Sequence, residues 1–194
     1  MKKNRQDYTG KVKKNNKEVH LSNNKTWILK IVLVAFILSL VLSLMTDSVI
    51  PSVPIFLSVA ILILFITLGI IFDMIGVSVT VAEEKVFHSM ASKKVKSTKT
   101  ALDLIENSSK VSSFCNDVIG DVCGIISGSA GVSIALSISK SLSINLVLTS
   151  LILTSLIASV TIGGKAIGKH LAINKSNAIL YSFARFLDKF KLKK

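Results

Sequence analysis

The chain has 194 residues, half of them hydrophobic, and 24 Lys and Arg against 11 Asp and Glu, which gives a net charge of +13. A mean hydropathy of +0.61 is typical of an integral membrane protein and argues against a soluble domain. All but one of the basic residues fall within 1–30, 82–110 and 165–194, beside long apolar runs and without interleaved aromatic residues. This pattern argues against nucleic acid as a partner and favours the lipid bilayer.

The N-terminal part of the chain divides into a polar tail and an apolar run. Residues 1–25 are rich in Lys and Asn with few large apolar side chains, and we expect a disordered basic cytoplasmic tail. Residues 26–46 predict an N-terminal transmembrane anchor. A secretory signal peptide is the alternative, but a long polar segment precedes the run and no A-x-A-like cleavage site follows it.

The remaining apolar runs predict three more membrane helices within a domain of residues 47–172. These spans cover about 52–73, 111–137 and 141–164, each long enough for a bilayer core of about 30 Å. Between the second and third spans, residues 83–107 have apolar positions at helical spacing with lysines on other faces, which predicts an amphipathic linker helix or helix pair.

The C-terminal residues 173–194 predict a basic amphipathic helix. Its Phe183, Phe186 and Phe190 would lie at the lipid interface, although packing against other cytoplasmic protein fits the same pattern. The predicted fold class is thus all-α, a polytopic integral membrane helical bundle with four transmembrane helices, a linker helix and a C-terminal helix.

The basic blocks predict the orientation of the chain. Lys and Arg are retained on the cytoplasmic side of membrane helices, and the three blocks adjoin the N-terminus, the linker and the C-terminus. We therefore expect a multi-pass protein of the cell membrane with both termini and the linker in the cytoplasm.

The third span carries glycines at regular spacing. Gly120, Gly124 and Gly128 are four residues apart, and small residues at this spacing let membrane helices approach closely, including the helices of a homodimer. Helix packing alone is sufficient to explain these glycines.

Acidic residues in membrane helices need a further explanation. Asn116, Asp117 and Asp121 begin the third span, and Asp73 ends the second. Such acids usually face a pathway or a partner, and hard cations such as Mg²⁺ prefer oxygen ligands. The alternative is that the acids sit at headgroup level and pair with nearby lysines.

Enzyme signatures are missing from the sequence. The three histidines are scattered without metal-ligand spacing, and no nucleophile elbow, Walker A or zinc-protease motif occurs. We therefore expect a protein that is not an enzyme.

Residues 72–187 resemble the membrane domain of the CorB/CorC and cyclin M (CNNM) family of magnesium and cobalt transport-related proteins. Met90 and Ala91, followed by residues 101–107 (A-L-D-L-I-E-N), look like the linker helix of the family, L-A…A-L-x-L-L-E-[DN]. Residues 116–121 fall at the G-N-N-x-x-N helix of the family. Residues 164–172 (G-K-A-I-G-K-H-L-A) are similar to its G-E-I-I-P-K-T-L-A motif.

The resemblance implies a homodimer that holds a dehydrated Mg²⁺, or another divalent cation, between polar side chains and a backbone carbonyl. Carried over by position, Asp73 stands near the first serine of the family, Asn116 or Asp121 near the coordinating asparagine, and Gly164 at the motif glycine. The chain departs from the family at Lys165, which replaces a glutamate and would repel a cation unless it snorkels to the surface.

Further departures are residues 73–77, D-M-I-G-V in place of S-G-S-E-T, and Gly168 in place of the motif proline. The nucleotide-binding CBS domains that follow in the family have no counterpart in this sequence, so ATP as a ligand cannot be inferred.

The sequence therefore predicts a small membrane relative of this family that binds or moves divalent cations. A non-transporting scaffold or partner subunit, assembled through the glycine-rich third span, is the alternative. A membrane-active toxin fits the basic, serine-rich composition less well.

Overall fold

Long helices dominate the fold. The structure is a computed structural model that describes residues 21–49 and 52–191, so most of the predicted basic tail lies outside the described residues. In chain order the elements are α1 (Leu21–Val49), α2 (Ile55–Val81), α3 (Glu84–Ser92), α4 (Thr98–Glu106), α5 (Ser108–Ser113), the π-helix η2 (Phe114–Gly120), α6 (Asp121–Leu142), α7 (Leu146–Asn174) and α8 (Ser176–Lys191).

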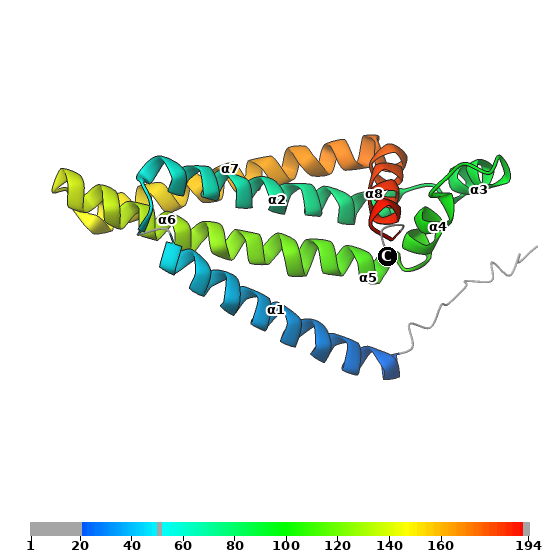
Figure 1. Cartoon of the computed structure of the whole chain (residues 1–194), viewed down its shortest axis with the longest axis horizontal. Helices are drawn as coiled ribbons and strands as arrows, with labels where there is room; N and C mark the ends of the chain where they lie inside the picture. The colour runs from blue at the N-terminus through cyan, green and yellow to red at the C-terminus, as the bar shows by residue number, and fades with distance from the viewer. Residues whose placement is uncertain (1–20, 50–51, 192–194) are drawn as a thin grey trace, which may run out of the picture.

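Within the described residues, four helical segments are long and apolar enough to cross a membrane: Trp27–Thr46, Ile55–Val81, Ser108–Leu142 and Leu146–Asn174. The third consists of α5, η2 and α6 in one continuous rod. This confirms the prediction of an all-α chain with four candidate membrane helices. Figure 1 shows the four rods extending along the long axis, with α3, α4 and α8 at one end, called here the α8 end.

The helices extend beyond the predicted spans. α2 continues past Asp73 to Val81, and α7 begins at Leu146 and continues past Gly164 to Asn174. α1 begins at Leu21, so the last five residues of the predicted tail are helical. Charge-free windows mark the part of a helix that can lie in hydrocarbon, whereas backbone hydrogen bonding continues through a charged residue. The two glycines at 163 and 164 therefore do not end the helix.

The central unit contains α2, α6 and α7, which pack against one another, while α1 lies along α6. Leu62 and Ile66 of α2 meet Ala130 and Ile134 of α6 in a buried cluster that Ile157 of α7 completes. No residue in the most apolar stretch of α1 is buried. α1 therefore has the character of a lipid-facing helix beside a three-helix core.

The α8 end has a second core. The linker is a pair of helices, α3 and α4, joined by a turn. Phe87 of α3, Ala101 of α4 and Leu180 of α8 are fully buried, and Val79 of α2 packs among them. Complete burial of a Leu or Phe side chain stabilises a fold by about 1.5–3 kcal/mol. This core holds α8 across the ends of the membrane helices, as Figure 1 shows.

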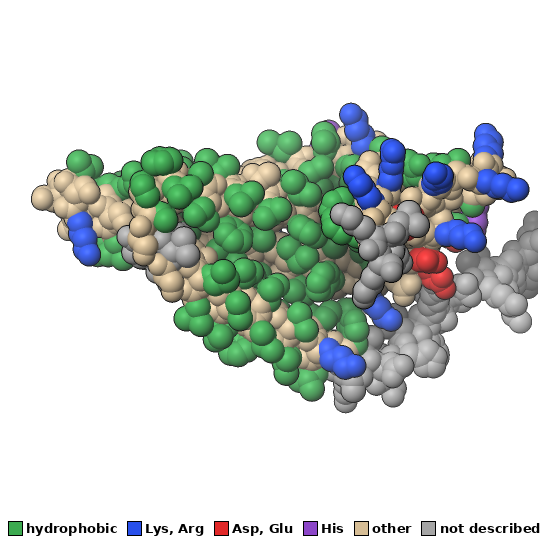
Figure 2. Space-filling model, in the orientation of Figure 1, with side chains coloured by type: hydrophobic (Ala, Val, Ile, Leu, Met, Phe, Trp, Pro, Cys, Tyr) green, Lys and Arg blue, Asp and Glu red, His purple; other side chains and the backbone are tan. Residues whose placement is uncertain are grey.

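Charge is distributed unevenly over the surface. Figure 2 shows hydrophobic side chains covering the visible face of the long helices and basic side chains gathered at the α8 end. The distribution fits a protein whose long helices contact lipid and whose α8 end lies in the aqueous boundary region.

Candidate functional site

A short π-helix follows α5 near the start of the third membrane rod. η2 spans Phe114–Gly120 and carries Asn116 and Asp117. Single π-helical turns inside α-helices are rare and occur frequently at functional sites. The rod approaches α2 closely here, because a Cβ atom on Gly69 would lie 3.2 Å from the Cβ of Cys123. The polar residues of η2 are thereby brought against α2.

Asn116 lies directly over Gly76 of α2. A Cβ atom at position 76 would overlap the amide oxygen of Asn116, so only glycine leaves room for this side chain. The amide Nδ2 of Asn116 donates a hydrogen bond to Ser112 Oγ at 3.3 Å. The other end of the amide, Oδ1, is buried and has no hydrogen-bond partner among the residues that the structure describes.

Asp73 lies one helical turn before Gly76 on α2. Its side chain is only 5% exposed, and its Oδ2 is the second buried oxygen without a hydrogen-bond donor in the described part of the chain. The ammonium of Lys169 on α7 lies 3.7 Å from this oxygen, and the Lys169 side chain is 52% exposed. Positions three apart on a helix are neighbours, with Cβ atoms about 5–6 Å apart. Asn116 therefore packs over α2 about one turn from Asp73, where α2, η2 and α7 meet.

A second pair links the third rod to α7. The ammonium of Lys165 lies 3.5 Å from Asp121 Oδ1 and donates a hydrogen bond to the carbonyl oxygen of Gly120 at 3.5 Å. Lys165 is 21% exposed and Asp121 67% exposed at the side chain. Lys165 therefore neutralises an acid of the third rod instead of extending freely away from the protein.

Glycines allow α7 to lie close to α2. A Cβ atom at Gly164 would collide with Ile70, and one at Gly168 would lie 2.8 Å from Met74. This close approach brings the backbone at Lys165 and Lys169 near the side of α2 that carries Asp73.

The charged cluster lies about one hydrocarbon thickness along α2 and α7 from the starts of these helices. At 1.5 Å per residue, Asp73 is about 27 Å from the start of α2 and Lys165 about 28 Å from the start of α7. A hydrocarbon core is about 30 Å thick. This spacing fits a cluster at headgroup level, which a long lysine side chain can reach, while the protein itself buries Asp73.

The structure brings some of the predicted site residues together and leaves others apart. Asn116 of η2 packs over Gly76, one turn from Asp73 on α2. Lys165 contacts both Asp121 and the carbonyl of Gly120, and Gly164 packs against Ile70 of α2. Asp117 is exposed. A Cβ atom at Gly124 or Gly128 would meet no atom of another segment within 4 Å, so these two glycines line no helix contact within the described chain.

Sequence reasoning did not identify Gly76, Ser112 or Lys169 as parts of this cluster. The spacing of Lys165 and Lys169, one turn apart near the end of a membrane helix, was the available signal for Lys169. Gly76 carries no such signal, because its importance depends on which residue of another helix lies above it.

The donors present suit a hard cation that keeps part of its water shell. Within residues 21–49 and 52–191 no three His, Cys, Asp or Glu side chains gather into a metal cluster. The junction instead offers one carboxylate and one amide oxygen. Mg²⁺ is commonly bound by one or two carboxylates with several waters retained, so this set fits Mg²⁺ better than a transition metal.

Comparisons of the chain with protein-family models, curated proteins and solved structures found no match. The chemistry available at the junction is therefore the main guide to function.

Proposed function

We propose that this protein binds a divalent cation, with Mg²⁺ the best fit, at the junction of α2, η2 and α7 and moves it across the membrane. The observation that carries the proposal is the pair of buried oxygens, Asp73 Oδ2 and Asn116 Oδ1, which have no hydrogen-bond donor in the described chain. Leaving such atoms unsatisfied costs about 1–3 kcal/mol each, and more for a charged group. A bound cation would satisfy both.

The two lysines of α7 act as tethered counter-cations in this proposal. Lys169 neutralises Asp73 when no metal is bound, but 3.7 Å is longer than a good charge-assisted hydrogen bond. Its long, half-exposed side chain can withdraw toward the headgroups without exposing apolar surface. An entering cation would therefore replace the Lys169 ammonium at Asp73.

The position of the junction suits entry from the α8 end. Basic residues gather at that end, which the retention of Lys and Arg assigns to the cytoplasm. The resemblance to the CorB/CorC and cyclin M family supports divalent cations as cargo and a homodimer as the assembly. Asp73 and Asn116 are among the positions to which that resemblance assigns cation ligands.

The proposal is tested with the full chain in proteoliposomes. Entry of Mg²⁺ or Co²⁺ is followed with an enclosed fluorescent indicator, and metal binding in detergent is followed by the shift in unfolding temperature. Asp73→Asn should abolish both signals, and Asn116→Ala should weaken both. Asp103→Asn, a charge-matched change at an exposed site on α4, should alter neither.

Two outcomes are decisive. Flux and metal stabilisation that survive in Asp73→Asn would refute the junction as the cation site. Metal stabilisation that depends on Asp73, without any flux, would limit the function to cation binding.

A second candidate is a membrane scaffold or partner subunit, favoured by the open face of the third rod. Gly124 and Gly128 meet no other segment of the described chain, and such a stripe of small residues permits close helix association. In this case Gly124→Leu would abolish self-association in crosslinking or mass photometry, whereas Asp73→Asn would change neither assembly nor metal response.

A further inference from the structure

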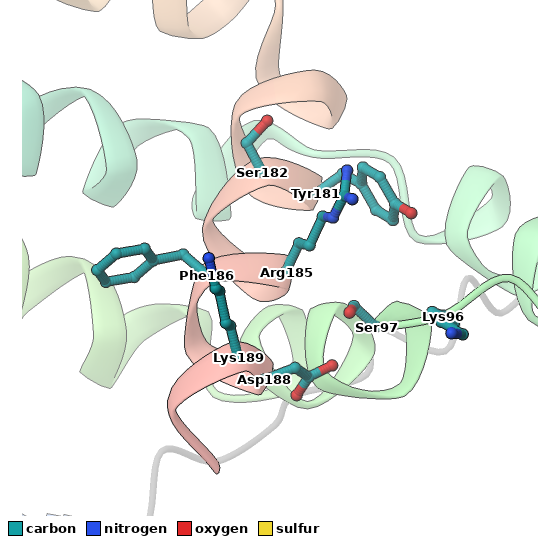
Figure 3. Close-up of a pocket in the computed structure, with 8 residues that line it drawn as sticks. All are labelled: Lys96, Ser97, Tyr181, Ser182, Arg185, Phe186, Asp188 and Lys189. Atoms are coloured by element: carbon teal, nitrogen blue, oxygen red, sulfur yellow. The ribbon is translucent and has the colours of Figure 1, made fainter. Parts of the chain in front are cut away.

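A groove separates α8 from the turn between α3 and α4. Its volume is about 850 Å³, and Figure 3 shows that its lining side chains come from α8 and from the α3–α4 turn. Arg185, Lys189 and Lys96 supply three positive charges, and the hydroxyl groups of Tyr181, Ser182 and Ser97 lie among them.

Within the described residues, the side chains that line the groove carry more positive than negative charge. Asp188 is the one carboxylate in the lining, and Thr100 of α4 donates a hydrogen bond of 2.6 Å to its Oδ1. The ion pairs within the described chain involve none of Lys96, Arg185 and Lys189. The Ser182 hydroxyl donates to the carbonyl of Ala178, so the groove presents three cations and the hydroxyl groups of Tyr181 and Ser97 to an anion.

An aromatic pair borders the same groove. Phe186 lines it, and Phe190 lies one turn further along α8 with its ring centroid 4.7 Å from that of Phe186. These rings are 57% and 63% exposed, whereas Leu180 and Ala184 on another face of α8 are buried. α8 starts two residues after the end of the membrane helix α7, so its exposed rings lie near the membrane boundary.

We propose that this groove binds the phosphate of an anionic phospholipid headgroup. Arg185 and Lys189 would hold the phosphate with help from Lys96, the hydroxyl groups would donate hydrogen bonds to its oxygens, and Phe186 and Phe190 would contact the upper acyl chain. Guanidinium groups bind phosphate in a bidentate manner, and basic pockets beside membrane helices bind anionic headgroups. A soluble phosphate would use the same cations but gain nothing from the exposed rings.

The test compares two variants that lose the same charge. The groove variant combines Lys96→Gln, Arg185→Gln and Lys189→Gln, and the control combines Lys85→Gln, Lys93→Gln and Lys110→Gln at exposed sites outside the groove. Binding of phosphatidylglycerol to the full chain is titrated by native mass spectrometry. Loss of the specific site should weaken binding about tenfold in the groove variant and less than twofold in the control. Equal losses in both variants would show diffuse surface attraction and overturn the proposal.

Two further arms distinguish the source of the phosphate and the role of the guanidinium. Inorganic phosphate and ATP at millimolar concentration should not displace the lipid, and displacement by either would assign the groove to a soluble phosphate. Arg185→Lys keeps the charge but removes bidentate binding, and it should weaken lipid binding measurably while the unfolding temperature stays unchanged. Full binding in Arg185→Lys would contradict the assigned role of Arg185.

Discussion

Replacing Lys169 by Gln separates a cation site from a structural ion pair at Asp73. The change removes the ammonium that lies 3.7 Å from Asp73 Oδ2 and keeps a polar side chain in its place. If Lys169 occupies the position of a metal ion, its loss should increase metal affinity. If the pair only ties α2 to α7, its loss should reduce stability and leave metal without effect.

The expected change in Mg²⁺ affinity follows from the distance between Lys169 and Asp73. Two unit charges at this distance attract by about 4 kcal/mol at an effective dielectric constant of about 20. Lys169 is half exposed, so solvent screening and the ordering of its side chain reduce the net contribution to about 1 kcal/mol. Since 1.4 kcal/mol corresponds to a factor of ten, Lys169→Gln should tighten Mg²⁺ binding by about five- to tenfold.

When metal is absent, Lys169→Gln should lower the stability of the folded protein. Asp73 would lose the cation that neutralises it, which costs about 1 kcal/mol because Lys169 is half exposed. The unfolding temperature in detergent should therefore fall in the presence of a chelator and recover with Mg²⁺ to a larger extent than in the wild type. The double variant Lys169→Gln and Asp73→Asn should regain stability and lose the metal response. Comparing it with the two single variants gives the free energy of coupling between Lys169 and Asp73.

The assay is thermal unfolding across a Mg²⁺ titration, with Lys175→Gln as the control at an exposed lysine just beyond α7. The cation model is refuted if Lys169→Gln lowers stability and Mg²⁺ restores none of it. It is also refuted if the variant binds Mg²⁺ more weakly than the wild type.

Three other changes test the packing that builds the site. Gly76→Ala should displace the Asn116 amide and remove most of the stabilisation by metal. The control Gly163→Ala, where a Cβ atom meets no neighbour within 4 Å, should leave that stabilisation intact. A normal metal response in Gly76→Ala would contradict the role of the contact between Gly76 and Asn116. Phe87→Ala should destabilise the α8 end by about 3 kcal/mol in thermal unfolding, and a cost below 1 kcal/mol would show that this core is dispensable. Gly168→Leu should separate α7 from α2 and lower the yield of folded protein in size-exclusion chromatography, and an unchanged yield would argue against tight contact there.

The membrane helices were predictable because their signal is local. A charge-free run of about 20 apolar residues identifies a helix in hydrocarbon without knowledge of its neighbours. The ends were less predictable, since α2 and α7 continue as helices past Asp73 and Gly164 into the boundary region. Amphipathic spacing located the linker but not the turn that divides it, where Lys94 and Ser97 have φ values of 57° and 67° without a glycine.

The candidate site was predictable only in part. Asp73 and Asn116 stood out because acids and amides are costly in membrane helices. Their adjacency depends on Gly76 and on the π-helix, and both depend on how the third rod approaches α2. The regular spacing of Gly120, Gly124 and Gly128 did not reveal that Gly120 lies near Lys165 while the other two meet no neighbouring segment.

The contact between α2 and α7 repeats itself after one helical turn. Gly164 packs against Ile70, and Gly168 packs against Met74. In each helix the two positions are four residues apart. The helices run in the same direction (Figure 1). A slide of one turn, about 6 Å, would bring Val160 onto Ile70 in place of Gly164, where a Cβ atom collides, so shape opposes such a ratchet between the two helices. Such a slide would also place Lys165 opposite Asp73 and take it away from Asp121, so the Lys165–Asp121 pair favours the same register.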